Sequence, residues 1–320
     1  MIGIGVDVGG TFVKFFVVNE RGEVLQTQRM ETDSARSTRD FIVRVGDFIK
    51  QMAREYSGQN LAVAVGAPGD VDNHRGILRY NPNLKFTQNS DWPIADELQA
   101  YTGIRPWVAN DATLAAWGIY ETELKHQGTN VLTVTLGTGV GGGLILNGSL
   151  YQGSHGTAGE IGHMKIADTH TGPLCGCGAH GCLEAFVGTV GLKRQIVQAV
   201  QQHPDSVLAK LVRENPDFKM DIAFRAAEQG CPLALKIWEN TGFYLGIGIA
   251  NLALILDLDT VVLTGGVSGA APYFMPALKE VLAQQQIQTP FKNLQVRISQ
   301  MPNIGGIGAA LYALNQTQPK

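Results

Sequence analysis

The sequence predicts an α/β protein that is large enough for two domains. Short runs of β-branched residues that end in glycine alternate with stretches of helical spacing, which is the pattern of the α/β class. The 320 residues provide ample core for two domains. Three of the predicted strands are followed directly by glycine turns, and ligands of open α/β sheets bind at the carboxyl ends of strands.

The elements follow from two periodicities. Ile2–Asp7 is predicted as a strand, and Phe12–Asn19 resumes as a second strand after a glycine turn. Apolar residues recur at helical spacing within Arg39–Tyr56, which predicts a helix. In chain order, the other expected elements are strand Leu61–Val65, helix Ile94–Thr102, strand Pro106–Ala109, helix Ala112–Glu123, strands Val131–Leu136 and Gly143–Asn147, helices Gly191–Gln202, Ile222–Gln229 and Leu233–Leu254, strand Thr260–Leu263 and helix Gly305–Leu314.

Composition and charge exclude several classes of function. A formal net charge of −3 gives no electrostatic footprint for nucleic acid or an anionic membrane. The N-terminus has no basic segment and is predicted to be a buried strand, not a signal peptide. The longest apolar stretch, Leu245–Leu256, is interrupted by Asn251 and is too short to span a bilayer. We therefore expect a cytoplasmic protein with neither a nucleic-acid nor a membrane partner.

The segment from Gly159 to Glu184 has the spacing of a zinc site. It contains one imidazole and three thiols, separated by eleven, one and four residues: His163, Cys175, Cys177 and Cys182. Disulfides are the alternative, but Cys175 and Cys177 are too close for an easy bridge, and three thiols leave one unpaired. The pattern predicts a closed, structural Cys₃His zinc site in a reducing compartment. Glu160 and Glu184 flank it, which suggests a knuckle that holds a ligand-binding loop.

The glycine turns suggest phosphate binding. The first strand ends in Asp7 and is followed by Gly9, Gly10 and Thr11, where backbone N–H groups and a hydroxyl can approach phosphate oxygens. Asp7 could hold Mg²⁺ through water. One such turn could be a plain hairpin, but the pattern recurs after two further strands, at Thr138-Gly139 and Gly265-Gly266. None of these turns is a P-loop or a dinucleotide fingerprint in context.

Three acidic residues are candidates for chemistry. Asn110 and Asp111 lie between a strand and a helix, where both residue types are favoured as helix caps. Asp111 would also lie at a strand end, where a carboxylate can accept the proton of an attacking hydroxyl in phosphoryl transfer. Glu160 and Glu184 could be solvated surface acids, but their position beside the knuckle favours hydrogen bonds to polyol hydroxyls.

These residues together resemble the ROK family (repressor, open reading frame, kinase) of the actin-like and sugar-kinase superfold. The most specific segments are LGTGVGGGLILNGSLYQGSHGTAGEIGH and CGCGAHGCLE, and the resemblance covers essentially the whole chain. It implies a two-domain actin-like ATPase (ribonuclease H-like) fold with a zinc knuckle and with ATP and hexose bound in a cleft. The small domain is expected at residues 1–117 plus about 303–320, and the large domain at 118–302.

The resemblance also implies residue roles. Asp111 would be the catalytic base, with Asn110 beside it on the sugar. The other sugar contacts would be Glu160, His163, Glu184, Gly66 of GAPG and Asn83 of NPNL, which has Asn81 as a near neighbour. Phosphate and adenosine contacts would come from Asp7, Gly9, Gly10, Thr11, Thr138, Gly139, Gly265 and Gly266. Many family kinases carry lysine directly after GGT, whereas here Phe12 follows and Lys14 lies three positions after Thr11.

The expected activity is transfer of phosphate from ATP with Mg²⁺ to the 6-hydroxyl of a hexose, glucose first, by a homodimer. N-acetylmannosamine, N-acetylglucosamine and fructose remain alternative substrates, and another nucleotide or polyphosphate remains an alternative donor. A non-catalytic sugar-sensing regulator and a nucleotidase or actin-like assembly ATPase are rival functions. Family repressors carry a helix-turn-helix domain before the DxGGT strand, and we expect none here because the sequence begins at that strand.

Overall fold

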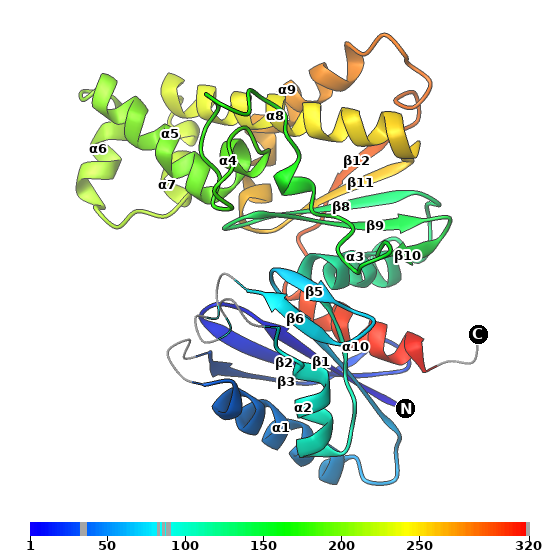
Figure 1. Cartoon of the computed structure of the whole chain (residues 1–320). Coiled ribbons are helices and arrows are strands. Elements are labelled where there is room, and N and C mark those ends of the chain that lie inside the picture. The colour runs from blue at the N-terminus through cyan, green and yellow to red at the C-terminus, as the bar shows by residue number, and fades with distance from the viewer. Residues whose placement is uncertain (33–36, 82–83, 85–86, 88–90, 318–320) are drawn as a thin grey trace. The chain divides into compact units, whose positions relative to one another are not determined.

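The structure is a computed structural model that describes residues 1–320 except 33–36, 82–83, 85–86, 88–90 and 318–320. The chain divides into two compact units. The first unit comprises residues 1–129, 143–159 and 301–320, and the second comprises 130–142 and 160–300. The described residues form two five-stranded sheets and a two-stranded ribbon, with helices packed on the sheets (Figure 1).

In the first unit, three parallel strands bring their carboxyl ends to one edge of a sheet. The strand order is β3 (Val24–Glu31), β2 (Phe12–Asn19), β1 (Ile2–Val8), β4 (Leu61–Ala67) and β7 (Trp107–Asn110). β1 pairs parallel to β4, and β4 parallel to β7, whereas β2 and β3 are antiparallel additions. The sequence gives no signal for β3, because this edge strand is largely exposed and lacks apolar alternation.

Strand β1 alternates between large apolar residues and glycine, and the two faces are used differently. Ile4 is fully buried in a core cluster that includes the apolar face of α1 (Thr38–Glu55). Gly3 and Gly5 face α10 (Ile304–Gln316), whose backbone lies where a β-carbon on either glycine would be. Since side chains alternate along a strand, Asp7 shares the α10 face. Its Oδ1 lies 3.8 Å from the position of a β-carbon on Gly305.

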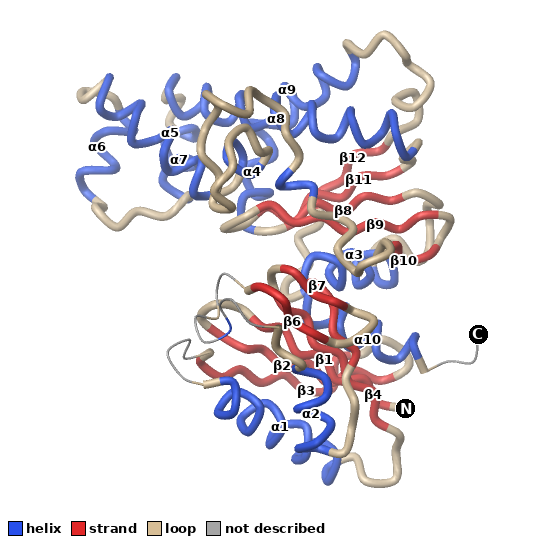
Figure 2. The backbone as a smooth tube through the Cα atoms, in the orientation of Figure 1, coloured by secondary structure: helices blue, strands red, loops and turns tan. Residues whose placement is uncertain are grey.

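The remaining elements of the first unit surround this sheet (Figure 2). They are β5 (Asp70–Asp72), β6 (Ile77–Tyr80), α2 (Ile94–Thr102) and α3 (Asp111–Thr122). The strand β10 (Ser149–Tyr151) also belongs to this unit but is an edge strand of the other sheet. The strand expected at Gly143–Asn147 begins earlier, as β9 (Val140–Leu146), because its glycines are extended and fit a close helix contact. A β-carbon on Gly143 would overlap the side chain of Ala116 in α3.

The second unit has β8 (Val131–Leu136) and β12 (Gln295–Ile298) paired parallel to β11 (Thr260–Thr264) on either side. The order of the whole sheet is β10-β9-β8-β11-β12. The helical elements are η2 (Ile161–His163), α4 (Glu184–Val187), α5 (Thr189–Gln202), α6 (Val207–Glu214), α7 (Asp221–Glu228), α8 (Pro232–Leu256), η3 (Gly266–Ala270) and α9 (Ala271–Ala283).

Helices α8 and α9 pack against one another through glycines. A β-carbon on Gly242 would overlap a backbone carbonyl of α9, and one on Gly246 would lie 2.7 Å from Val281 Cβ. Helix α9 was not predicted, because Pro272 and Pro276 interrupt its pattern; Pro272 occupies the first turn, where proline is tolerated. Within the part of the chain that the structure describes, no helix has the length and apolarity needed to cross a bilayer.

Candidate functional site

The ends of β1, β4 and β7 bring together the site residues predicted in the first unit. Asp7 pairs with Gly66 across β1 and β4, and Asn110 pairs with Ala67 across β4 and β7. The β-carbon position of Gly66 lies 3.7 Å from Asp111 Cα. Asp7, Gly66, Asn110 and Asp111 therefore lie along one edge of the sheet, as expected for the ligand edge of an α/β sheet.

The turn after β1 presents polar groups to solvent. Gly9 N–H donates to the carbonyl of Phe12 at 3.0 Å, which closes the turn, while Gly10 and Thr11 are exposed. The buried Thr32 donates from its hydroxyl to the Gly9 carbonyl at 2.6 Å, a support that the sequence did not indicate. The Gly10 N–H and the Thr11 hydroxyl are thus placed to meet an anion.

Asp7 and Lys14 form a charged pair beside this turn. They are cross-strand partners in the β1–β2 ladder, so their side chains share one face. Burial raises the pKa of Asp7, and the positive charge of Lys14 partly offsets this effect. Lys14 Nζ also donates to Asn303 Oδ1 at 3.0 Å, just before α10 begins. Lys14 therefore lies beside the glycine turn after β1 although it does not directly follow GGT.

Asn110 is the N-cap residue of α3. Its Oδ1 accepts from Ala112 N–H at 2.9 Å, and its Nδ2 donates to the Gly69 carbonyl at 3.1 Å. The capping interpretation of Asn110 is thus correct, and it leaves the amide oriented by the protein itself. Asp111 is the first residue of the helix, is partly exposed, and accepts from Ala112 N–H at 2.8 Å. One carboxylate at this strand end therefore borders solvent.

The structure describes one of the two asparagines in the NPNL segment. Asn83 lies outside the described residues, so its expected sugar contact stays a prediction. Asn81 is fully buried, and its Oδ1 accepts from Leu84 N–H at 3.1 Å. That contact orders the loop locally.

Two glycine turns lie side by side in the second unit. They follow the parallel strands β8 and β11, and Thr135 pairs with Thr264 directly before them. A β-carbon on Gly265, which has φ 95°, would overlap the Leu136 carbonyl, so only glycine fits this junction. Thr138 and Gly266 are exposed at the turns. Both predicted phosphate turns are therefore at one sheet edge.

The four expected metal ligands converge. The ligand atoms of His163, Cys175, Cys177 and Cys182 all lie within 4.8 Å of one another. Cys175 Sγ is 3.7 Å from His163 Nδ1, and Cys177 Sγ is 3.8 Å from Cys182 Sγ. In a tetrahedral zinc site the ligand atoms are roughly 3.6–3.8 Å apart, since Zn–S is about 2.3 Å and Zn–N about 2.0–2.1 Å. The donor set and its spacing fit a tetrahedral metal.

The thiols of this cluster have different acidities. Burial raises the pKa of Cys175 well above its usual range. Burial also acts to raise the pKa of Cys177, but the N–H of Ala179, the other two thiols and Lys165 together lower it. Lys165 Nζ donates to Cys182 Sγ at 2.7 Å, and this contact raises the pKa of Lys165. The lysine thus places a positive charge beside sulfurs that must become thiolates to bind a metal.

His163 can serve two purposes because its ring nitrogens face different groups. Nδ1 faces Cys175 within the metal cluster, and Nε2 lies 3.8 Å from Glu160 Oε2. With a metal on Nδ1, the proton of the neutral ring is on Nε2, where it can donate to the carboxylate or to a hydroxyl. Glu160 and His163 are thus neighbours, as the sugar-contact prediction requires.

Glu184 lies between the knuckle and the turn after β8. Its Oε2 accepts from Val140 N–H at 3.0 Å, and its Oε1 accepts from the Cys175 thiol at 3.3 Å. The sequence placed Glu184 beside the metal ligands but gave no sign of its contact with Val140.

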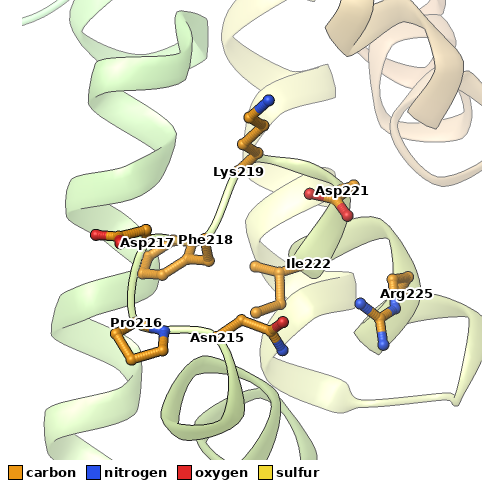
Figure 3. Close-up of a pocket in the computed structure, with 8 residues that line it drawn as sticks. All are labelled: Asn215, Pro216, Asp217, Phe218, Lys219, Asp221, Ile222 and Arg225. Atoms are coloured by element: carbon orange, nitrogen blue, oxygen red, sulfur yellow. The ribbon is translucent and has the colours of Figure 1, made fainter.

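A separate surface pocket of about 380 Å³ lies at the loop between α6 and α7 (Figure 3). Its lining residues are Asn215, Pro216, Asp217, Phe218, Lys219, Asp221, Ile222 and Arg225. Lys193 Nζ lies 5.0 Å from the centre of the Phe218 ring. Of the predicted site residues that the structure describes, none lines this pocket.

Comparisons with known proteins agree with this arrangement. The sequence matches the ROK family over residues 3–316. A glucokinase of Halalkalibacterium halodurans is 30% identical over 318 residues, which cover 98% of this chain and 95% of the relative. An N-acetylmannosamine kinase of Vibrio cholerae is 30% identical over 285 residues, 89% of this chain and 90% of the relative. The crystal structure of a ROK family glucokinase from Streptomyces griseus, in complex with glucose and AMPPNP, superposes with a TM-score of 0.79 at 28% identity, covering 98% of this chain and 100% of that one. This chain belongs to the ROK family.

Proposed function

We propose that this protein is an ATP-dependent hexose kinase that phosphorylates the 6-hydroxyl of glucose. Support comes from the relatives, which include glucokinases and a structure that holds both glucose and AMPPNP. The observation that carries the proposal is the pair of carboxylates, Asp7 and Asp111, at the ends of β1 and β7 with β4 between them. Phosphoryl transfer to an alcohol needs a metal-holding carboxylate and a proton acceptor, together with accurate positioning.

The two carboxylates have separate roles in this proposal. Asp7 would hold Mg²⁺ through water, because its carboxylate is partly enclosed and lies on the strand that leads into the exposed glycine turn. Mg²⁺, when bound with the nucleotide, neutralises phosphate charge. Asp111 would accept the proton of the 6-hydroxyl while the hydroxyl oxygen attacks the γ-phosphorus. The Ala112 N–H bond to Asp111 Oδ1 orients the carboxylate without neutralising it.

Glu160, His163 and Glu184 would bind sugar hydroxyls. Carboxylate oxygens and an imidazole N–H are suitable hydrogen-bonding partners for a polyol. We propose Zn²⁺ for the cluster, held by His163 Nδ1 and the three thiolates as a closed structural site. In this arrangement the metal fixes the ring of His163, and the chemistry belongs to Asp111.

N-acetylmannosamine is the second candidate substrate, since an N-acetylmannosamine kinase matches the chain at the same identity as a glucokinase. A coupled assay with ATP and glucose, fructose, N-acetylmannosamine or N-acetylglucosamine distinguishes these substrates. We expect the highest kcat/KM with glucose. A higher value with an N-acetylated sugar would revise the substrate but leave the kinase assignment intact.

The assay also needs a control for contaminating kinases and for the rival functions. The Asp111→Asn variant, purified in parallel, should show little turnover with any sugar. Polyphosphate in place of ATP tests the donor, and magnetic resonance of the product tests whether the 6-position carries the phosphate. A wild-type chain that binds sugar yet phosphorylates none of the four would indicate a sugar-sensing regulator.

A further inference from the structure

The carboxylate of Glu184 connects two segments of the second unit. Oε2 accepts from Val140 N–H, at the end of the glycine turn that follows β8, and Oε1 faces Cys175 of the knuckle. A β-carbon on Gly139 would overlap Oε2, and one on Gly176 would lie 3.7 Å from Oε1. The carboxylate is thus in van der Waals contact with the turn as well as hydrogen-bonded to it.

The other end of the same turn is held by the segment that follows Glu184. Thr189 N–H donates to the Gly137 carbonyl at 3.0 Å, and Gly188 N–H donates to the Glu184 carbonyl at 2.9 Å. Residues 184–189 therefore hydrogen-bond to both ends of the turn. The Glu184 side chain binds Val140 N–H at one end, and the Thr189 N–H binds the Gly137 carbonyl at the other. Without Glu184, the N–H of the 4% exposed Val140 would lose its carboxylate partner.

Glu184 is itself firmly placed. It begins α4 two residues after Cys182, which is fully buried, and Leu183 N–H donates to the Met164 carbonyl at 3.0 Å. The backbone that carries Glu184 is thus tied to the knuckle on its N-terminal side.

We propose that Glu184 is a positioning residue for nucleotide binding: its carboxylate fixes the turn Gly137–Val140 in the shape that contacts the phosphates of a nucleoside triphosphate. This inference rests on the proposed function, because the turn is assigned to phosphates there. It goes beyond the sugar-contact role expected for Glu184, which predicts no effect on nucleotide affinity in the absence of sugar.

Nucleotide affinity without sugar is the deciding measurement. We expect Glu184→Ala to weaken the Kd of Mg²⁺·AMPPNP roughly tenfold to hundredfold, the usual effect of losing a hydrogen bond to a charged group. Glu184→Gln keeps an oxygen that can accept from Val140 N–H, so its Kd should stay within about twofold of wild type. Glu160→Ala is the matched control, since Glu160 is another carboxylate beside the knuckle, and it should leave this Kd unchanged.

Amide hydrogen exchange tests the contact itself, whether or not the chain is a kinase. The Val140 amide should exchange faster in Glu184→Ala than in wild type, Glu184→Gln or Glu160→Ala. Unchanged exchange in Glu184→Ala would overturn the proposal, and so would faster exchange with an unchanged nucleotide Kd. A wild-type chain that binds no nucleotide would instead contradict the proposed function, and would thereby remove the nucleotide role assigned to Glu184.

A second variant covers the case in which Glu184→Ala folds poorly. A β-carbon at position 139 would occupy the space of Glu184 Oε2, so Gly139→Ala should weaken nucleotide binding when Glu184 is present. In the Glu184→Ala background the new β-carbon no longer overlaps a carboxylate, so Gly139→Ala should weaken nucleotide binding less. The effects of the two substitutions on the Kd should therefore be non-additive in a double-mutant cycle. Additive effects on the Kd would show that the two positions act separately and would overturn the proposal.

Discussion

At the scale of single residues, two carboxylates of similar chemistry lie in different surroundings. Asp7 is partly enclosed between β1 and α10, whereas Asp111 borders solvent at the first turn of α3. Burial raises the pKa of Asp7, and its cross-strand partner Lys14 acts in the opposite direction. Lys14 only partly offsets the cost of burying the charge of Asp7. A divalent cation beside Asp7 would offset more of this cost, which suits a role in holding a metal.

The Asp111→Asn variant tests the catalytic base. Asparagine keeps an oxygen that can accept from Ala112 N–H, so fold and sugar affinity should be retained. We expect kcat to fall by roughly 10²–10⁴, the usual effect of losing a general base. Steady-state kinetics on folded protein gives the answer, and a variant that keeps more than about a tenth of wild-type kcat would contradict the assignment.

The Asp7→Asn variant should be more stable than wild type but unable to bind Mg²⁺·ATP. The folded-state pKa is raised above 3.8, so the ionised carboxylate lowers stability above that raised pKa. We expect this gain to be fully present near neutral pH, where the carboxylate of the wild type is ionised. The gain should shrink as the pH falls and disappear below 3.8, where the carboxyl is protonated in both states. Urea unfolding at several pH values measures it.

Asp72 provides a control of opposite sign in the same unit. Burial acts to raise its pKa, but the Arg75 N–H and the Arg79 guanidinium together lower it. Asp72→Asn should therefore destabilise the protein above pH 3.8, with the difference lost as the pH falls through the lowered folded-state pKa. If both variants shift stability in the same direction, the electrostatic explanation of Asp7 fails.

At the scale of elements, the knuckle and β1 are stabilised by different kinds of contact. The knuckle has little regular structure, and its backbone is held by short-range bonds such as Cys175 N–H to the Ala179 carbonyl at 2.8 Å. A bound metal would cross-link the four ligands and so stabilise a segment that has little apolar core of its own. Strand β1 is instead stabilised by packing against a segment distant in the sequence, because the backbone of α10 fits directly against Gly3 and Gly5.

The Cys177→Ser variant should lose the metal and weaken sugar binding together. Cys177 is exposed, so the substitution creates no core cavity, and a loss of stability would report the missing ligand. Metal affinity of wild type should fall with falling pH, because the thiolates must stay deprotonated to ligate. Cys231→Ala is the control, since this buried cysteine lies outside the cluster and its removal should leave one zinc per chain. Elemental analysis measures the metal content, and titration with sugar measures the affinity. Full sugar affinity in metal-free protein would contradict the proposed structural role of the metal.

The Gly5→Ala variant should destabilise the first unit. Its new β-carbon would overlap the Gly306 carbonyl, so α10 would have to move away from β1 at an expected loss of about 1–3 kcal/mol. Gly269→Ala is the matched control, because among the described residues no atom beyond its chain neighbours and its own helix backbone lies within 4 Å of its β-carbon position. Thermal or urea unfolding compares the two, and equal stabilities would show that α10 does not depend on this contact.

At the scale of the whole molecule, each unit repeats one arrangement. β1 and β2 flank the glycine turn of the first unit, and β8 and β9 flank the glycine turn after β8. In both cases the turn follows a strand that belongs to a parallel set, so backbone N–H groups gather at the carboxyl edge of the sheet. The glycine turns that the sequence shows after these two strands therefore belong to the same structural unit of strand, turn and strand.

Features that depend on local chemistry could be predicted from the amino-acid sequence alone. The cluster of one histidine and three cysteines, the glycine turns after buried strands, and the first strand all follow from residue type and spacing, and the structure has each of them. Such features need only short-range rules, because a turn or a ligand cluster within twenty residues is specified by neighbouring residues.

Contacts between residues far apart in the chain could not be predicted in this way and become visible in the folded structure. Glu184 bonds to an amide 44 residues away, and Lys165 donates to Cys182 through a pairing that no spacing reveals. Helix α9 forms despite its prolines because Gly242 and Gly246 of α8 allow close packing on it. These contacts depend on sheet order and helix packing, which arise from burial of apolar surface across the whole chain and not from any local pattern.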